Sequence, residues 1–517
     1  MEMNKANSDI GIIGMGVMGQ NLLLNIADQG FSVVGYDKDL NKVKKLGEIA
    51  KKSSIHHTTD IKMFIQLLRR PRAIILLVPA GPIVDSVITD LLPYLEPDDL
   101  IIDAGNSYFK DTESREKFLI TKAIQFLGMG VSGGEEGARH GPSLMPGGPK
   151  KAYDRIHLIL EAIAAKVNGD PCVRYLGPGS SGHFVKMVHN GIEYGIMQLI
   201  AESYDLMKKG LGFNNIQLRD VYSEWNKGEL NSYLMEITSH IFNKLDLDTD
   251  TLSNSNASTN TINTISQTEA KTEAKTQTRA QTDLLIDQIS DVAHQLGTGM
   301  WTVKSAMELQ VPTPTIDVAV TMRDLSSWIN QRSEISKMYQ KPILNIRDNV
   351  KDNIRDNIRD NPKQFVLELG QALYTSIIIV YCQGMAVLRA ASNQYHYELD
   401  LEAIAKIWRG GCIIRAALLE DISNAFHRQN DLSNLLLDPN LSLKVMQYQE
   451  NLRSIITKSI QLGIALPGMM ASLGYFDSLR SEGLPSNLIQ AQRDYFGSHG
   501  YERINRQGVF HTEWEHK

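Results

Sequence analysis

A glycine-rich turn near the N-terminus limits the folds that this chain can adopt. The apolar run at 10–13 leads into Gly-Met-Gly-Val-Met-Gly at 14–19, and a helical pattern follows at 20–29. In a strand-turn-helix context such glycines let the backbone approach a pyrophosphate, which the helix N-terminus faces with free amides and a partial positive charge. We therefore predict a dinucleotide-binding domain rather than a glycine-rich turn without a ligand.

The residues after the second strand-like run bear on the choice of dinucleotide. Asp37 suits hydrogen bonds to an unmodified ribose and would repel a 2′-phosphate, which favours NAD. Lys38 would instead attract that phosphate, and Asp39 opposes Lys38. The local sequence leans to NAD and leaves NADP open.

The distribution of strand and helix patterns divides the 517 residues into parts. The runs at 10–13, 32–36, 73–78 and 100–103 are rich in Ile, Val and Leu, as parallel strands buried on both faces are. They alternate with helical patterns, whereas helical patterns alone dominate after about residue 180. We predict an α/β doubly wound domain (1–180), a large all-α domain (181–483) and an irregular C-terminal tail (484–517).

Two segments of the helical part are unlike their surroundings. Residues 248–282 consist mostly of Thr, Ser, Asn, Gln and Ala with a few charges, which predicts a flexible surface loop with an optional short helix at 268–275. Residues 344–362 contain a four-residue Ile-Arg-Asp-Asn repeat, which fits a marginal helix or a loop equally well. We treat both as inserts in the 181–483 domain.

Four polar residues recur at helical spacing within 181–194. Lys186, His189, Asn190 and Glu193 lie at i, i+3, i+4 and i+7, so a helix places them on one face. A lysine and a carboxylic acid two turns apart can converge on one small substrate as a proton acceptor and donor, which predicts an enzyme. A solvated charged face is the alternative interpretation.

Charge and cysteine content exclude several classes of protein. A net charge of −6 disfavours a general nucleic-acid binder. Cys172, Cys382 and Cys412 are too far apart for a disulfide framework or a metal cluster and suit a reducing compartment. The polar N-terminus is unlike a signal peptide, and the apolar run 377–388 is too short to span a bilayer. We expect a cytoplasmic protein without a metal, with 377–388 as a buried core helix.

Six further motifs carry a family resemblance. They are Gly-Asn-Ser at 105–107, Val-Ser-Gly-Gly-Glu-Glu-Gly-Ala-Arg at 131–139, Gly-Pro-Ser-Leu-Met-Pro-Gly-Gly at 141–148, the stretch 183–194, Ile-Trp-Arg-Gly-Gly-Cys-Ile-Ile-Arg at 407–415, and Gln-Ala-Gln-Arg-Asp-Tyr-Phe-Gly at 490–497. In this order they resemble the decarboxylating 6-phosphogluconate dehydrogenases of the long-chain type, over nearly the whole chain except the two inserts. The resemblance implies a Rossmann-like first domain and oxidative decarboxylation of 6-phosphogluconate to ribulose 5-phosphate and CO2.

The resemblance also assigns roles to residues. Lys186 is implied as the general base on the C3 hydroxyl, which requires a lowered pKa, and Glu193 as the acid that protonates C1. A homodimer is implied, because the family's tail reaches the partner subunit's site. Positions implied to bind substrate are Asn106, Ser132, Gly133, Gly134, His189, Asn190, Tyr194, Thr298, Arg323, Arg493 and His499. Positions implied to bind NADP or NAD are Gly14, Met15, Gly16, Val17, Met18, Gly19, Asp37, Lys38, Val78, Ala80 and Asn106.

Three motifs depart from the family pattern. The family's Asn-Arg-Thr reads Asp-Lys-Asp at 37–39, its Lys-Gly-Thr-Gly-Lys-Trp-Thr begins with Leu296 and has Met300, and its Val-Lys-Ala-Gly reads Val-Pro-Ala-Gly at 78–81. The first lysine lost at 296 is a phosphate contact in the family, worth about 1.5–3 kcal/mol unless Lys304 replaces it. We expect intact chemistry with altered affinity.

Two other functions stay open at this point. A related β-hydroxyacid dehydrogenase with a different acid as substrate is motivated by Leu296, whereas Arg323, Arg493 and His499 argue for a phosphate. A catalytically silent nucleotide-binding protein is the non-enzymatic alternative. The presence of both Lys186 and Glu193 argues against it.

Overall fold

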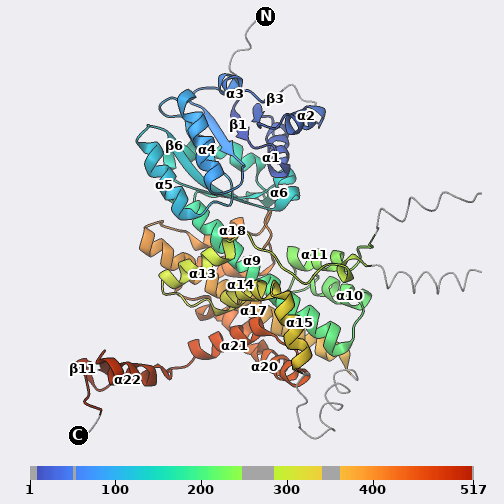
Figure 1. The fold of residues 1–517 in the computed structure, drawn as a ribbon, viewed down its shortest axis with the longest axis vertical. Coiled ribbons are helices and arrows are strands. Elements are labelled where there is room, and N and C mark those ends of the chain that lie inside the picture. The colour runs from blue at the N-terminus through green and yellow to red at the C-terminus, as the bar shows by residue number, and fades with distance from the viewer. Residues whose placement is uncertain (1–7, 50–53, 247–283, 340–360, 515–517) are drawn as a thin grey trace, which may run out of the picture.

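The computed structural model describes residues 8–49, 54–246, 284–339 and 361–514. A domain with a central sheet lies at one end of the molecule, a larger helical body adjoins it, and a short tail projects from the helical body (Figure 1). The expectations for 248–282 and for nearly all of 344–362 fall outside the described residues.

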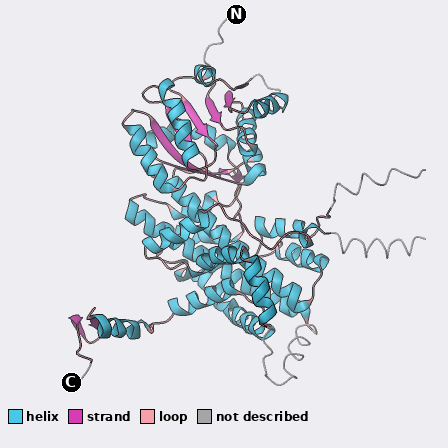
Figure 2. Ribbon diagram, viewed as in Figure 1, coloured by secondary structure: helices cyan, strands magenta, loops and turns pink. Residues whose placement is uncertain are grey.

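A seven-stranded sheet organises the first domain, in the order β3-β2-β1-β4-β5-β6-β7 (Figure 2). The first six strands in this order are parallel, and β7 pairs antiparallel with β6. Helices lie on both faces of the sheet, so the predicted doubly wound class is confirmed. The strands are β1 (Ile10–Ile13), β2 (Val33–Tyr36), β3 (Ile55–Thr58), β4 (Ala73–Leu76), β5 (Leu100–Asp103), β6 (Gln125–Ser132) and β7 (Ser143–Gly147).

The strand-like runs predicted from sequence correspond to β1, β2, β4 and β5, all of whose residues are buried. The helices of this domain connect the strands on either face. They are α1 (Val17–Asp28), α2 (Leu40–Ile49), α3 (Ile61–Leu67), α4 (Pro82–Leu91), α5 (Phe109–Ile120), α6 (Gly134–His140), α7 (Lys150–Asp154) and α8 (His157–Ile163).

The helical body begins with α9 (Ser181–Leu206) and is built around α9 and α17 (Pro362–Tyr395). Among the described residues, α17 is the one helix long and apolar enough to cross a membrane, and 78% of its most apolar window is buried. The buried core helix predicted at 377–388 is therefore confirmed. The other helices are α10 (Asn215–Trp225), α11 (Tyr233–Ile241), α13 (Thr298–Glu308), α14 (Pro314–Ser326), α15 (Ile329–Met338), α18 (Leu401–Ile407), α19 (Leu418–Arg428), α20 (Pro439–Leu462) and α21 (Pro467–Leu479).

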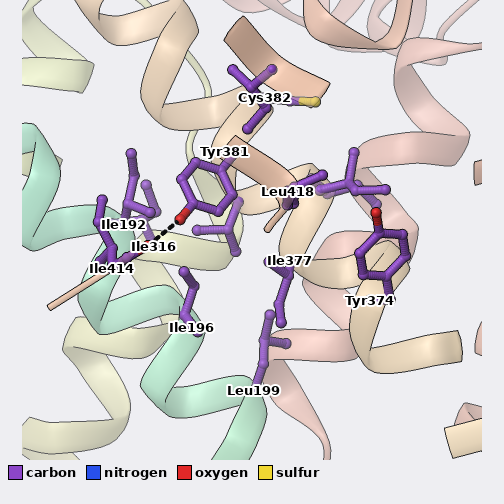
Figure 3. Close-up of a cluster of buried hydrophobic side chains, with 14 of the residues drawn as sticks. Ile192, Ile196, Leu199, Ile316, Tyr374, Ile377, Tyr381, Cys382, Ile414 and Leu418 are labelled. Atoms are coloured by element: carbon purple, nitrogen blue, oxygen red, sulfur yellow. Dashed lines mark hydrogen bonds between the residues drawn. The ribbon is translucent and has the colours of Figure 1, made fainter. Parts of the chain in front are cut away.

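Glycines bring α9 close to its neighbours. A Cβ on Gly191 would lie 2.5 Å from the Thr302 side chain of α13, and one on Gly195 would lie 2.8 Å from Val380 of α17. Beside this contact, apolar side chains of α9 and α17 interdigitate around Tyr381, whose hydroxyl donates to the Ile414 carbonyl at 2.9 Å (Figure 3). The helix that carries the candidate site is thus held in a dense core.

The tail is more regular than the sequence indicated. Instead of an irregular segment, it contains α22 (Ser486–Gly497) and an antiparallel hairpin of β10 (Tyr501–Arg503) and β11 (Arg506–Phe510). The fully buried carboxylate of Asp494 accepts hydrogen bonds from the Gly500 and Thr512 amides, the Trp514 indole and His511. These bonds join helix and hairpin, and explain why a glycine-rich segment has a defined fold.

Candidate active site

Lys186, His189, Asn190 and Glu193 lie on α9 where it passes from the sheet domain into the helical body. Lys186 is 6% exposed, His189 is fully buried and Asn190 is 8% exposed, while the Glu193 side chain is 21% exposed. These side chains are therefore not a solvated charged face, and that alternative is wrong.

The first turns of α9 rest directly against strands β6 and β7. A Cβ on Gly182 would lie 2.3 Å from the carbonyl oxygens of Gly128 and Met145. A Cβ on Gly130 would lie 2.4 Å from Lys186 Cβ and 2.9 Å from its Cγ. Because Gly130 has no side chain, the Lys186 stem can pass over the strand and reach the site at its end.

His189 links Ser132 to Asn190. Its Nε2 lies 3.2 Å from Ser132 Oγ, and its Nδ1 lies 3.0 Å from Asn190 Oδ1 and 3.9 Å from Glu193 Oε2. Burial, with the nearby Lys186, holds the pKa of His189 well below its usual range, so the ring is neutral. Nδ1 faces acceptors, so it carries the proton, and Ser132 then donates to Nε2. The Asn190 side-chain oxygen is thereby engaged and its amide NH2 stays available.

Lys186 and Glu193 have pKa values displaced in opposite directions. Burial lowers the pKa of Lys186, and the Glu193 carboxylate only partly offsets this. Burial raises the pKa of Glu193, against the opposing effects of Lys186 and Arg323. Such shifts favour a neutral amine and a protonated carboxyl group, the states a general base and a general acid require.

A loop of the helical body completes this site, and the sequence analysis gave it no role there. The Ile413 amide donates to Ser132 Oγ at 3.4 Å, and the buried Trp408 ring meets His189 edge to face at 5.6 Å. Gly411 O accepts from the Ser143 amide at 2.7 Å. Ser132 and Ile413 are 281 positions apart, so no local pattern could reveal the contact. Only the motif at 407–415 singled the segment out.

Three of the residues implied to bind substrate meet at one corner of the site. The Arg323 guanidinium stacks on the Tyr194 ring, 3.4 Å from its centroid. Thr298 is the first residue of α13, and a Cβ on the next residue, Gly299, would lie 2.5 Å from the Tyr194 ring. A cation and a helix N-terminus thus adjoin each other, an arrangement suited to an anion.

The departures from the family motif lie on the rim of this corner. The Leu296 side chain is 91% exposed and Met300 is 52% exposed, so neither is part of the core. Lys304, the proposed substitute for the lost lysine, interacts electrostatically with Glu308, a turn farther along α13. The role of Lys304 as a replacement for the lost lysine stays a prediction.

The glycine-rich turn has the form that a pyrophosphate requires. Gly14 has a φ of +101°, and a Cβ there would lie 2.3 Å from the Leu77 carbonyl oxygen. A Cβ on Gly19 would lie 1.8 Å from the Gly14 carbonyl oxygen, whereas one on Gly16 meets nothing within 4 Å. The start of α1 at Val17 has no side-chain cap. Open backbone in front of uncapped amides fits a dinucleotide phosphate.

The Asp37 side chain points toward the glycine-rich turn. Its Oδ2 accepts from the Met15 amide at 2.8 Å and lies 3.4 Å from Lys42 Nζ, and its Oδ1 accepts from the Asp39 amide at 2.9 Å. Its side chain is 12% exposed, whereas the Lys38 side chain is 69% exposed and pairs with Asp90 at 2.8 Å. The carboxylate that favoured NAD is thus partly neutralised, and the exposed charge is that of a lysine.

Val78, Ala80 and Asn106 lie on the loops that follow strands β4 and β5. These loops touch, since a Cβ on Gly105 would lie 3.2 Å from the Val78 carbonyl oxygen. Asn106 and Ala80 are exposed, and Gly133 and Gly134 follow the next strand, β6. The structure therefore gathers these positions at the carboxyl ends of the parallel strands, where open α/β sheets bind ligands.

Arg493 and His499 are not brought to this site within one chain. Both are exposed in the tail, which projects from the opposite end of the helical body to the sheet domain (Figure 1). Arg493 Nη1 donates to Gln490 Oε1 at 3.0 Å, a contact within α22.

Comparison with known proteins gives consistent matches over the chain. The model of the NAD binding domain of 6-phosphogluconate dehydrogenase matches residues 9–177, and that of the 6-phosphogluconate dehydrogenase C-terminal domain matches 182–269 and 261–514. The NADP(+)-dependent, decarboxylating 6-phosphogluconate dehydrogenase of Bacillus subtilis is 45% identical over 510 residues, covering 98% of this chain and 99% of that protein. The decarboxylating 6-phosphogluconate dehydrogenase 1 of Spinacia oleracea is 45% identical over 508 residues, covering 98% and 97%.

A solved structure agrees with the fold as well. That of Plasmodium falciparum 6-phosphogluconate dehydrogenase, described in its apo form and in complexes with NADP+ and with 6-phosphogluconate, matches with a TM-score of 0.85 at 41% identity. The match covers 98% of this chain and all of that one.

Proposed function

The chain belongs to the 6-phosphogluconate dehydrogenase family, and on that premise we propose that Lys186 and Glu193 carry the proton transfers of its reaction. The protein is an oxidoreductase that decarboxylates 6-phosphogluconate to ribulose 5-phosphate and CO2. The observation that carries the assignment is the pair on α9 formed by buried Lys186 and partly buried Glu193, whose pKa values are displaced in opposite directions.

The pair divides the proton transfers as follows. Neutral Lys186 removes the proton of the C3 hydroxyl, because burial makes the uncharged amine accessible. The resulting ammonium stabilises the negative charge on the C3 oxygen as the C1 carboxylate leaves as CO2, so the ketone is the electron sink and no metal is proposed. Protonated Glu193 then delivers a proton to the enediol carbon that was C2 of the substrate and becomes C1 of ribulose 5-phosphate. NADP, when bound, accepts the hydride from C3.

The surrounding polar residues orient the substrate. Ser132, Gly133, Gly134, His189, Asn190 and Asn106 are proposed to hold its carboxylate and hydroxyl groups. Tyr194, Thr298 and Arg323 are proposed to hold its phosphate, supported by the stacked Arg323 and the adjoining N-terminus of α13. Retention of this corner favours a phosphorylated acid over the unphosphorylated substrate of a related β-hydroxyacid dehydrogenase.

We propose NADP as the cofactor, with Lys38 facing its 2′-phosphate. Asp37 is held by the Met15 amide and partly neutralised by Lys42, which reduces its repulsion of that phosphate. The Bacillus subtilis relative is named as NADP(+)-dependent. The remaining positions at 14–19, together with Val78 and Ala80, are proposed to contact the rest of the dinucleotide.

A homodimer with shared sites is proposed from the tail. Leu488, Ile489 and Phe496 on α22 are 62%, 58% and 73% exposed, which is unusual for a segment that folds alone. Docking on a partner subunit would bury them and deliver Arg493 and His499 to the partner's phosphate corner. The division into domains at 1–180, 181–483 and 484–517 stays a prediction, as does a cytoplasmic location, which the three buried free thiols suit.

The proposed proton-transfer roles are tested by turnover of purified protein with 6-phosphogluconate, following reduced nicotinamide and CO2 together. Lys186→Met is expected to abolish both signals, while Glu193→Gln should retain hydride transfer in a single turnover and lose most steady-state turnover. A Lys186→Met variant with wild-type kcat would refute the assignment. Negligible turnover in the wild-type protein, equal to that of Lys186→Met, would support a silent nucleotide-binding protein.

The cofactor proposal is tested by kcat/KM with NADP and with NAD. We expect NADP to be preferred, and Lys38→Ala to reduce kcat/KM for NADP while leaving that for NAD unchanged. Lys44→Ala, on the same helix-turn segment, is the matched control. A clear preference for NAD would show that Asp37 governs the ribose pocket.

A further inference from the structure

The buried Arg115 of α5 binds both loops that lie between the glycine-rich turn and the substrate site. It is 5% exposed. Its Nε and Nη2 donate to the two Asp85 oxygens at 2.7 and 3.1 Å, and Nη2 also donates to Gly81 O at 3.0 Å. Its Nη1 donates to Asp103 Oδ2 at 3.3 Å and to Ser107 Oγ at 3.4 Å. One side chain thus joins the 77–81 loop and the start of α4 to the 104–108 loop.

The second of these loops is held on both sides of Asn106. Asp103, which is fully buried, accepts from the Gly105 amide at 3.1 Å and from Ser107 Oγ at 2.6 Å. Asn106 itself is exposed between these two anchored residues. Its direction therefore depends on Asp103, and Asp103 in turn faces the Arg115 guanidinium.

A buried ion pair is a costly way to gain stability, because desolvation offsets much of the attraction. The planar guanidinium, however, sets several acceptors at defined angles, which a lysine cannot do. Strands β4 and β5, which precede these two loops, supply a comparison. At their opposite ends Arg72, 4% exposed, donates from Nη1 to Asp99 at 2.7 Å, far from either loop. Arg72 joins the strands where no ligand is proposed, and Arg115 joins them where both ligands are.

We propose that Arg115 is a positioning residue that fixes Asn106 relative to the 78–81 loop, so that cofactor and substrate are held in one geometry. This inference rests on the proposed function, since it takes Asn106 to contact both ligands and Val78 and Ala80 to contact the dinucleotide. Arg115 acts through Asp85, Gly81 and Asp103 and touches neither ligand.

The test compares Arg115→Lys with Arg72→Lys, each a conservative change at a buried arginine that links the β4 segment to the β5 segment. Both variants are expected to lower Tm. Arg115→Lys should also lower kcat/KM by about 10- to 100-fold, the cost of misplacing reacting groups by about 1 Å, with KM raised for both NADP and 6-phosphogluconate. Arg72→Lys should leave both KM values within about twofold of wild type, since its pair is remote from the site.

Asp85→Asn supplies the second arm, because the Asp85 side chain is 58% exposed and its change is tolerated even where Arg115→Lys does not fold. Asp85→Asn weakens the contact of Arg115 with the start of α4, beside the 78–81 loop, and leaves the contact with Asp103 in place. KM for NADP should therefore rise more than KM for 6-phosphogluconate. Wild-type KM values in folded Arg115→Lys, equal KM changes in Arg72→Lys, or unchanged KM for NADP in Asp85→Asn would each overturn the positioning role. Absence of turnover by the wild-type protein would instead refute the proposed function.

Discussion

Replacing Gly130 by alanine should displace Lys186 while leaving the fold intact. The added Cβ would lie 2.4 Å from Lys186 Cβ, which is 1.0 Å closer than the 3.4 Å at which ordinary van der Waals contact begins. Gly130 lies within β6 and its φ is not in the left-handed region, so alanine brings no backbone strain. The overlap must therefore be relieved by moving α9 or the lysine by about 1 Å.

The consequence for catalysis is larger than that for stability. Overpacking a core position costs about 1–3 kcal/mol, whereas misplacing a reacting group by about 1 Å costs about 100-fold in rate. We expect Gly130→Ala to lower kcat by about 100-fold with a modest change in KM for NADP, measured by NADPH formation at saturating 6-phosphogluconate.

Gly128→Ala is the matched control on the same strand. Gly128 lies two residues earlier on the same face of β6, and its added Cβ would meet Thr112 at 2.7 Å and His183 at 2.8 Å instead of Lys186. It should lose similar stability in thermal unfolding and keep most of its kcat. A folded Gly130→Ala variant with kcat within twofold of wild type, or equal losses in both variants, would refute the reasoning.

Three further predictions concern the acid–base pair, the phosphate rim and the tail. The pH profile of kcat/KM should be bell-shaped. It falls on the acid side, where Lys186 becomes protonated at a pH below the usual range of lysine, and on the alkaline side, where Glu193 ionises above the usual range of glutamate. In Glu193→Gln the residual activity should lose the alkaline limb and keep its acid limb, because Glu193 is already protonated where Lys186 titrates; an unchanged alkaline limb would contradict the assignment. Leu296→Lys, at a 91% exposed position, should lower KM for 6-phosphogluconate by about tenfold or more, whereas Leu296→Met should not, and equal KM values would remove this rim from the phosphate site. Asp494→Asn should raise KM for 6-phosphogluconate and leave the main thermal transition unchanged, since its partners lie within the tail; a lowered main transition would show instead that this carboxylate supports the body.

The part of the site that lies on one helix was predictable from sequence. Spacings of i, i+3, i+4 and i+7 are properties of a helix itself, so Lys186 and Glu193 could be placed on one face without knowing their neighbours. Other helices approach α9 closely at Gly191 and Gly195 of the same stretch. The sequence signals of strands β1, β2, β4 and β5 were equally local, because each strand is a continuous apolar run buried on both faces.

The remainder depends on contacts between distant segments. Strand β6 was missed because it contains Gly128 and Gly130, which weaken a strand pattern and are needed where α9 packs against the sheet. Arg115 gave no signal because its acceptors at 81 and 85 are 34 and 30 positions away. In the tail, glycines indicated irregular structure, whereas the bonds of one buried aspartate, at position 494, hold the segment after it in a hairpin.

The continuity of α9 limits how this molecule can admit and release its ligands. Its first turn packs against strands β6 and β7 at Gly182, its middle carries Lys186 and Glu193, and its end lies in the core of the helical body. Because buried contacts hold α9 at both ends, the two domains cannot swing apart about the segment that precedes it without breaking the packing of α9 against the sheet. Opening and closing must therefore come from elements that border α9, and Lys186 and Glu193 keep their spacing throughout the catalytic cycle.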